Sequence, residues 1–156
     1  MGLESANYVL YSRELVAPRL VRIIQNFGGS ENSDSRAGTR DFVIHGERHW
    51  IDLRWLPQTQ TGRPAVFIRV ALCNPNEVGQ HLKQLFGELF RSGDVVMTDT
   101  RSKLQWFEWN DNMWDQLWAS FQRQQADFRK TFGNYEAAIS ADKVFENLRK
   151  LPGSKH

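Results

Sequence analysis

Residues 41–56 read DFVIHGERHWIDLRWL, and residues 65–72 read AVFIRVAL. The first stretch contains two strand-like runs, 41–45 and 48–56, which meet at Gly46-Glu47. Two short alternating runs separated by a Gly-containing pair are typical of a β-hairpin with a tight turn. The stretch therefore predicts two antiparallel strands next to each other in a sheet.

Alternation along the second run assigns its side chains to two faces of that sheet. Ile51, Leu53 and Trp55 share one face, which is apolar, and Trp50, Asp52 and Arg54 share the other. The second face is half polar, so we expect it to lie partly in water.

The stretch AVFIRVAL follows a turn of Pro, Thr, Gln and Gly residues at 57–64. Its β-branched residues and near-continuous apolar character predict the most buried strand of the sheet. Arg69 interrupts the run, and its strand neighbours the one that carries Asp52 and Arg54. A polar cluster on the sheet face is one interpretation of these three charges, and an ion pair covered by a helix edge is the other.

Helix-like periodicity marks four other segments. An amphipathic helix is predicted within 12–27, either beginning near Ala17 with Pro18 in its first turn or kinked at Pro18. A second helix is predicted to begin at Asn74, with that residue as its N-cap, and to end near Arg91. The others are predicted at 110–132 and 140–150.

Two more strands are predicted at 94–98 and 103–108, and residues 28–40 read as a flexible loop rich in Gly, Ser and Asn. Strands joined by short turns favour antiparallel pairing. The sequence therefore predicts an α+β fold: a single, mainly antiparallel sheet of about five strands with about four helices packed on it. With 156 residues, of which 40% are hydrophobic, we expect one domain spanning 1–156 with the flexible loop at 28–40.

The amino-acid composition excludes some classes of function but does not identify one. The 20 basic and 18 acidic residues give a net charge of +2, and they alternate along the chain, so there is no basic patch of the kind that binds duplex nucleic acid. No stretch approaches the roughly 20 apolar residues of a membrane span, and the N-terminus lacks the pattern of a signal peptide. Together with the lone Cys73, these features predict a cytoplasmic protein that does not bind membranes.

One histidine pair raises the possibility of metal chemistry. His45 and His49 flank a turn, and Asp52 or Asp41 lies near enough in sequence to supply a third ligand. The pattern is not the helical HExxH of zinc proteases, in which the Glu directly follows the first His. A metal-dependent enzyme using His45, His49 and Asp52 is one hypothesis, and solvated hairpin residues are the other.

Cys73 lies between a strand and a predicted helix start, where a helix dipole lowers a thiol pKa. A nucleophilic cysteine also needs an activating base, and no Cys/His motif lies near it. The sequence favours a structural cysteine, with His81 as a distant candidate partner.

Four of the six tryptophans lie between residues 106 and 118. Trp114 and Trp118 follow helical spacing and are predicted to lie in the core. Trp106 and Trp109 cannot both follow one strand face, so at least one of them is a candidate for exposure. Because Trp106 lies near Arg101 and Lys103, stacking on single-stranded nucleic acid is a further hypothesis.

The hairpin HWIDLRW, the strand AVFIRVAL leading into NPNEV, and the aromatic helix near the C-terminus resemble, in general character, small immunity proteins of bacterial toxin systems. These systems include contact-dependent inhibition and polymorphic toxins. The resemblance implies a non-enzymatic protein, without cofactor or metal, that binds and neutralises a cognate toxin domain.

The surface that we predict for such a partner combines aromatic and charged residues, because Trp and Arg are enriched in binding hot spots. Its residues are Arg48, Trp50, Asp52, Arg54 and Trp109, and the loop 28–40 is a possible addition. The two alternatives that we retain are the metal-dependent enzyme and the single-strand nucleic-acid binder.

Overall fold

The computed structural model describes residues 5–32, 38–60 and 62–133. Its strands are β1 (Ser5–Tyr11), β2 (Ser30–Asn32), β3 (Arg40–His45), β4 (Trp50–Leu56), β5 (Ala65–Ala71), β6 (Val96–Asp99) and β7 (Gln105–Trp106). Its helices are α1 (Ala17–Asn26), α2 (Val78–Phe90) and α3 (Asp111–Phe132).

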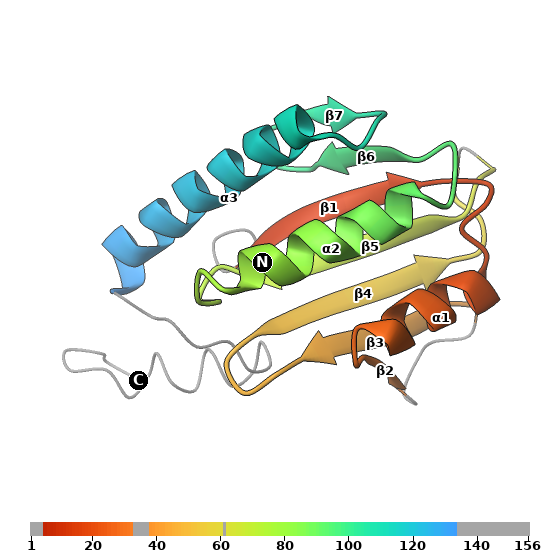
Figure 1. The fold of residues 1–156 in the computed structure, drawn as a ribbon, viewed down its shortest axis with the longest axis horizontal. Helices are drawn as coiled ribbons and strands as arrows, with labels where there is room; N and C mark the ends of the chain where they lie inside the picture. The colour runs from red at the N-terminus through yellow and green to blue at the C-terminus, as the bar shows by residue number, and fades with distance from the viewer. Residues whose placement is uncertain (1–4, 33–37, 61, 134–156) are drawn as a thin grey trace.

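The strands form one antiparallel sheet in the order β2-β3-β4-β5-β1-β6-β7 (Figure 1). The predicted hairpin is present as β3 and β4, which pair from Arg40 opposite Trp55 to His45 opposite Trp50. β1 lies between β5 and β6, and Tyr11 pairs with Ala65 on one side and with Val96 on the other. The first strand of the chain thus joins the hairpin half of the sheet to its C-terminal half.

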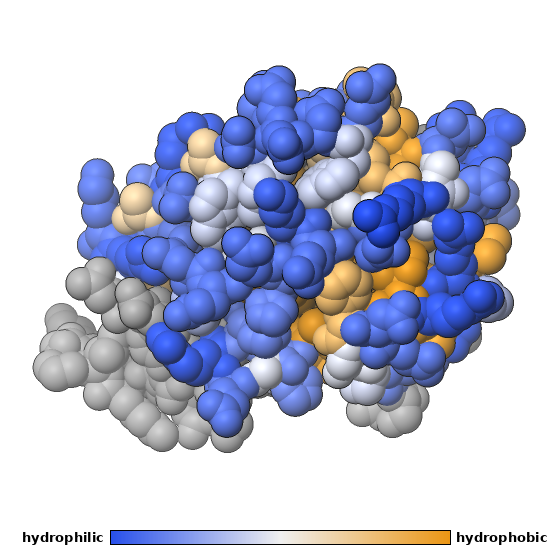
Figure 2. Space-filling view, in the orientation of Figure 1, coloured by the Kyte–Doolittle hydropathy of each residue, from blue (hydrophilic) through white to orange (hydrophobic). Residues whose placement is uncertain are grey.

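All three helices lie on the same side of the sheet (Figure 1). The core fills the space between them and the sheet, and the rings of Tyr8 in β1 and Phe86 in α2 meet edge to face there, with centroids 5.4 Å apart. Seen from the helix side, the surface is mainly hydrophilic, with hydrophobic residues gathered toward the right of the view (Figure 2). The helices therefore cover one face of the sheet with a shared apolar layer.

Aromatic residues of α3 and of the segment just before it pack against two glycines of α2. The rings of Trp109, Trp114, Trp118 and Phe121 follow one another with centroids 5.2–6.1 Å apart. A Cβ added at Gly79 would lie 2.9 Å from the Trp118 ring, and one at Gly87 would lie 3.2 Å from the ring nitrogen of Trp109. The two glycines therefore allow the indoles to approach the backbone of α2.

Several predicted boundaries are confirmed. α1 begins at Ala17 with Pro18 in its first turn, which decides between the two alternatives for that helix. Asn110 caps α3, because its side chain accepts a hydrogen bond from the Met113 N–H. Gly133 ends the same helix with a positive φ, the conformation for which glycine is suited.

Other predictions need correction. The sheet has seven strands instead of about five, because β1 was not predicted and because residues 30–32, assigned to the flexible loop, pair with β3. Three helices are present in the described part of the chain instead of four, and the helix predicted at 140–150 lies outside it. α2 begins at Val78, and Asn74 is not its cap, because a turn of i to i+3 hydrogen bonds occupies the preceding residues.

Candidate functional site

The side of the sheet opposite the helices is covered by no helix or strand of the described residues, and we call it the open face (Figure 1). Its side chains alternate with core residues along each strand. On β4, for example, Ile51 and Leu53 are buried, and the intervening Asp52 is half-exposed. The other open-face residues used below are Asn7, Val9, Tyr11, Asp41, His45, Trp50, Arg54, Phe67, Arg69 and Val96.

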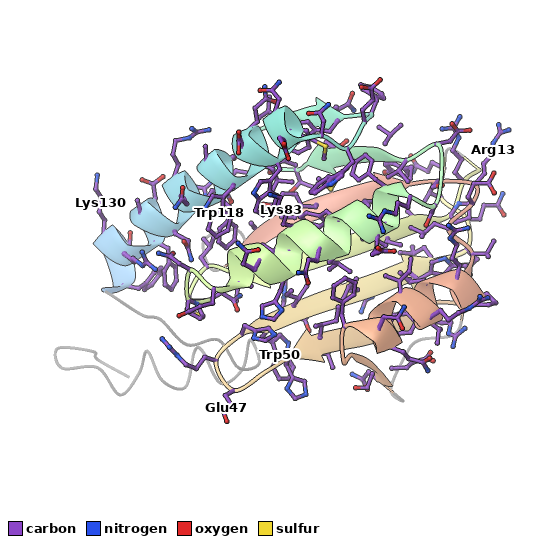
Figure 3. The ribbon with its side chains drawn as sticks, in the orientation of Figure 1. Arg13, Glu47, Trp50, Lys83, Trp118 and Lys130 are labelled. Carbon is purple, nitrogen blue, oxygen red and sulfur yellow. The ribbon has the colours of Figure 1, made fainter. Side chains whose placement is uncertain are left out.

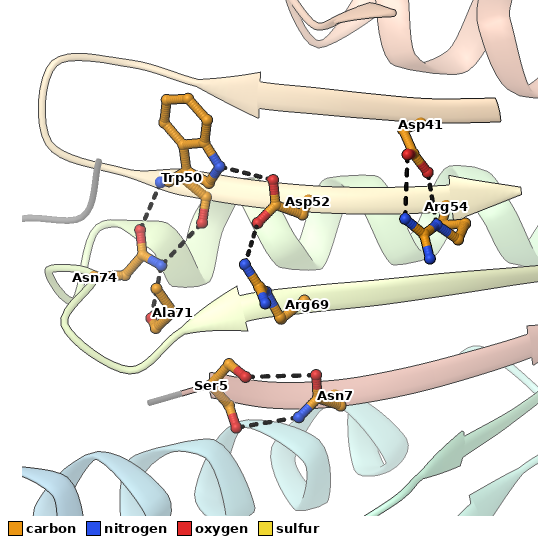
Figure 4. A network of polar contacts seen from close by, with 9 residues as sticks. All are labelled: Ser5, Asn7, Asp41, Trp50, Asp52, Arg54, Arg69, Ala71 and Asn74. Carbon is orange, nitrogen blue, oxygen red and sulfur yellow. Dashed lines mark hydrogen bonds and ion pairs between the residues drawn. The ribbon is translucent and has the colours of Figure 1, made fainter. Parts of the chain in front are cut away.

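Two ion pairs cross the strands of the open face (Figure 4). Arg54 contacts Asp41 with both ends of its guanidinium, at 2.7 and 3.2 Å, and Arg69 contacts Asp52 at 3.3 Å. Each pair joins residues that the strand register places directly opposite one another. The hydrogen bond to Asp41 also raises the pKa of Arg54. The strand register therefore holds each arginine opposite an aspartate.

Trp50 lies next to these ion pairs, on the side toward the β3–β4 turn. Its indole N–H donates to Asp52 at 2.8 Å, and its ring stacks on that of His45 with centroids 5.0 Å apart. Asp52 thus accepts from both Trp50 and Arg69. Because these contacts fix the ring in a half-buried position, Trp50 is an ordered aromatic group at the edge of a charged cluster.

The buried side chain of Asn74 fixes the backbone at Trp50. Its Oδ1 accepts from the Trp50 N–H at 2.8 Å, and its Nδ2 donates to the Trp50 carbonyl at 3.1 Å and to the Ala71 carbonyl at 2.7 Å (Figure 4). Gln125 of α3 in turn donates to the Asn74 carbonyl at 2.8 Å. Asn74 therefore connects the start of β4 to the end of β5 and, through its backbone, to α3.

An apolar strip lies beside the charged cluster. Phe67 of β5 is paired with Arg54 on one side and with Val9 on the other. Its side chain is 39% exposed, which makes it one of four large hydrophobic residues at the surface of the described part of the chain. The open face therefore carries the apolar Phe67 and Val9 beside ion pairs whose members lie on β3, β4 and β5.

The structure brings together three of the five residues predicted to bind a partner. Trp50, Asp52 and Arg54 all lie on the open face, and Arg48 lies in the exposed turn before β4. Trp109 lies on the helix side, where it packs against Gly87 and Phe90 of α2. No residue pattern predicts this separation, because it depends on how α2 packs against α3 and the segment before it.

Residues that the predicted surface omitted complete the cluster. Arg69 was recognised as a neighbouring charge, and the structure pairs it with Asp52. Asp41 was considered as a metal ligand, but it binds Arg54. Phe67 lies in the strand predicted to be the most buried, and the two-residue period of that strand places it on the open face.

The two histidines of the turn have different neighbours. His45 stacks on Trp50, whereas His49 stacks on His81 of α2, with centroids 4.2 Å apart. Burial lowers the pKa of His49, and the nearby His81 and His45 lower it further. Among the described residues, no group of three or more His, Cys, Asp or Glu side chains has a metal-binding arrangement. His45, His49 and Asp52 therefore do not form a three-ligand site.

Two other candidate residues are buried. Burial raises the pKa of the Cys73 thiol to about 11, so it is a poor source of thiolate at neutral pH. Trp106 is only 6% exposed, and its indole N–H lies 3.2 Å from the side-chain oxygen of Gln116. Trp106 therefore presents no open ring face on which a base could stack beside Arg101 and Lys103.

Two findings concern the chain more broadly. No helix in the described ranges has the length and apolar character needed to cross a membrane.

Comparisons with protein-family models, with curated proteins and with solved structures found no match to this chain.

Proposed function

We propose that this protein is a non-catalytic binding protein that docks a partner protein on the charged half of its open face, formed by β3, β4 and β5. Following the resemblance noted for the sequence, the partner class that we propose is a bacterial toxin domain, which the protein neutralises by occupying a surface that the toxin needs. The observation that carries the proposal is the cluster of Trp50, Arg54 and Arg69 with its paired aspartates.

The composition of this cluster suits a protein partner. Interface hot spots are enriched in Trp and Arg, and they bind best when the free protein already holds them in place. Here each arginine is held by an aspartate on the next strand, and the Trp50 ring is held by Asp52 and His45. Little side-chain entropy would then be lost when the partner binds.

The balance of charge also bears on the kind of partner. The cluster contains two arginines and two aspartates in direct contact, so it has no strong net charge. Such a surface favours a partner with alternating positive and negative groups over a uniformly basic or acidic one. The same balance gives the nucleic-acid alternative little support, because each of these guanidinium groups already faces a carboxylate.

The metal-dependent alternative receives less support than binding. Its three residues already make other contacts: His45 stacks on Trp50, His49 stacks on His81, and Asp52 accepts from Trp50 and Arg69. Stoichiometric zinc that is retained through purification and lost in His49→Ala would favour the enzyme over the binding protein.

A comparative capture experiment tests the proposal. Three baits are immobilised: the wild-type protein, the double variant Trp50→Ala/Arg54→Ala, and Arg123→Ala as a matched control from the exposed surface of α3. Each is exposed to the same lysate of the source cells, and retained proteins are quantified by mass spectrometry. We expect one stoichiometric protein on the wild-type and Arg123→Ala baits and its loss from the double variant. Equal retention on all three would contradict this placement.

A further inference from the structure

A pocket of about 330 Å³ lies at the end of the sheet opposite the β3–β4 turn. Arg13 marks this end in Figure 3, and Glu47 marks the turn. The pocket is lined by Arg13, Arg63, Asp94, Val95, Val96 and Phe107. None of these residues belongs to the charged cluster around Trp50.

The strand register explains why three charged residues meet here. Tyr11 pairs with both Ala65 and Val96, so the three strands β1, β5 and β6 are aligned at this row. Arg13 lies two residues after Tyr11, and Arg63 and Asp94 lie two residues before Ala65 and Val96. All three charged residues lie in turns just beyond the strand ends, so the alignment of the strands brings these turns together at one end of the sheet.

The buried Ser12 forms hydrogen bonds that connect the ends of these three strands. Its N–H donates to the Pro64 carbonyl at 3.3 Å, and its hydroxyl donates to the Gly93 carbonyl at 2.9 Å. The same hydroxyl accepts from the Glu14 N–H at 3.1 Å. Because Arg13, Arg63 and Asp94 each adjoin one of the bonded residues, the pocket is built on a fixed backbone.

The lining has two chemical parts. The guanidinium groups of Arg13 and Arg63 have no hydrogen bond or ion pair with any described residue. Beside them, Val96 and Phe107 supply apolar surface, and Phe107 is 65% exposed, the most of any large hydrophobic residue in the described part of the chain. Unpaired guanidinium groups bind carboxylates with strong, directional hydrogen bonds, and an exposed aromatic ring gains from contact with an apolar group.

Asp94 limits the charge that the pocket can accept. With two arginines and one aspartate in the lining, the pocket carries a single excess positive charge. A ligand with one negative charge balances it, whereas a dianion brings a second negative charge near the Asp94 carboxylate. The volume lies at the lower end of the range for small-molecule sites.

We propose that this pocket binds an organic monocarboxylate with an apolar body, the carboxylate facing Arg13 and Arg63 and the apolar body lying against Phe107 and Val96. Such a group is found in a small organic acid and at the C-terminal residue of a polypeptide. The inference is independent of the function proposed above, because the two sites share no residue.

The test is a titration of the full chain with 3-phenylpropanoate, followed by amide and indole chemical shifts in NMR spectra. We expect saturable shifts at the residues that line the pocket. The neutral analogue 3-phenylpropan-1-ol should bind roughly tenfold more weakly or not at all, because it cannot form the charge-assisted hydrogen bonds. Saturation by the alcohol at the same concentrations as the acid would overturn the proposal.

Three variants link the binding to the named residues. Arg13→Gln/Arg63→Gln should lose at least tenfold in affinity for the acid, and Phe107→Ser should weaken it as well. Arg123→Gln, an exposed arginine on α3, should bind as the wild type does. Unfolding temperatures measured alongside show whether each variant is folded. Unchanged affinity in the folded double variant, or no saturable binding by the wild type, would refute the site.

A second pair of probes distinguishes the two sources of the carboxylate. N-acetyl-Ala-Phe with a free carboxylate is compared with its C-terminal amide and with 3-phenylpropanoate. Tighter binding of the free peptide than of the small acid assigns the site to a chain terminus, and the reverse order assigns it to a small acid. Equal binding of the peptide and its amide would contradict carboxylate recognition.

Discussion

Asn74 shows how one buried side chain can determine the geometry of a surface that it does not reach. It uses three hydrogen bonds to hold the backbone of Trp50 against the end of β5. The sequence suggested a helix cap at this position, since Asn before Pro is a common helix start. The side chain instead pairs with a strand that precedes it by 24 residues, a contact that no local pattern reveals.

We predict that Asn74→Ala lowers the free energy of unfolding by about 2–4 kcal/mol, because it leaves buried backbone groups at Trp50 and Ala71 without partners. Urea denaturation at pH 7.5 measures the change. Asn76→Ala is the matched control, since Asn76 is exposed in the same turn and should change stability by less than about 0.5 kcal/mol. Equal effects of the two substitutions would show that the bonds to Trp50 contribute little.

His49 makes stability depend on pH. Burial and the neighbouring His81 and His45 lower its pKa in the folded protein below the ordinary value of about 6.5. The unfolded chain therefore binds this proton more readily than the folded one. The stability due to neutral His49 is fully present above about pH 6.5 and is lost as the pH falls through the folded pKa.

We therefore expect wild-type stability to fall between pH 7.5 and pH 5, and to fall less in His49→Gln. The measurement is the urea midpoint of both proteins across this range. Other titrating groups contribute to both curves, so their difference isolates His49. Parallel curves would mean that His49 has no shifted pKa.

At the scale of elements, Gly79 and Gly87 of α2 leave room for Trp118 of α3 and for Trp109, which lies just before α3. Trp118 lies against Gly79 and is stacked between Trp114 and Phe121, so it has little freedom to move aside. Gly is usually unfavourable inside a helix compared with Ala, by roughly 1 kcal/mol. Its presence in α2 therefore reflects the space that the indole requires.

We predict that Gly79→Ala destabilises the protein by about 1–3 kcal/mol, although alanine favours helix formation, because the new methyl group overpacks the Trp118 ring. Chemical denaturation again gives the change. The double variant Gly79→Ala/Trp118→Leu should recover part of the loss, since the smaller side chain makes room. A stabilising effect of Gly79→Ala alone would show that the ring is free to shift.

The elements that the sequence predicted well are those with a long or regular period. The hairpin of β3 and β4, the strand β5 and the helix α3 each repeat their pattern over six or more residues. β1 was missed because its residues are buried on both faces, apart from the half-buried Asn7 and Tyr11, so SANYVLY shows no clear alternation of polar and apolar residues. A strand inserted between β5 and β6 also receives its partners from distant parts of the chain, which local patterns do not encode.

At the scale of the whole molecule, β1 lies between β5 and β6 and joins the hairpin half of the sheet to its C-terminal half. The helices lie on one side of the sheet, and the open face on the other side carries ion pairs across β3, β4 and β5, with Phe67 and Val9 beside them. The sequence identified Trp50, Asp52 and Arg54 because they alternate with core residues. The pocket at Arg13 and Arg63 could not be predicted from the sequence. It forms where the ends of β1, β5 and β6 meet, and local patterns do not encode the register of these strands.

The affinity of the captured partner for matched variants tests the central claim most directly. The protein retained by the wild-type bait is purified and titrated by calorimetry against the wild type, Trp50→Ala/Arg54→Ala, and Arg123→Ala. We predict that the double variant binds at least about tenfold more weakly, since hot-spot Trp and Arg residues each contribute more than about 1 kcal/mol. Arg123→Ala should match the wild type. Equal affinities for all three folded proteins would contradict the assignment of the open face as the binding surface.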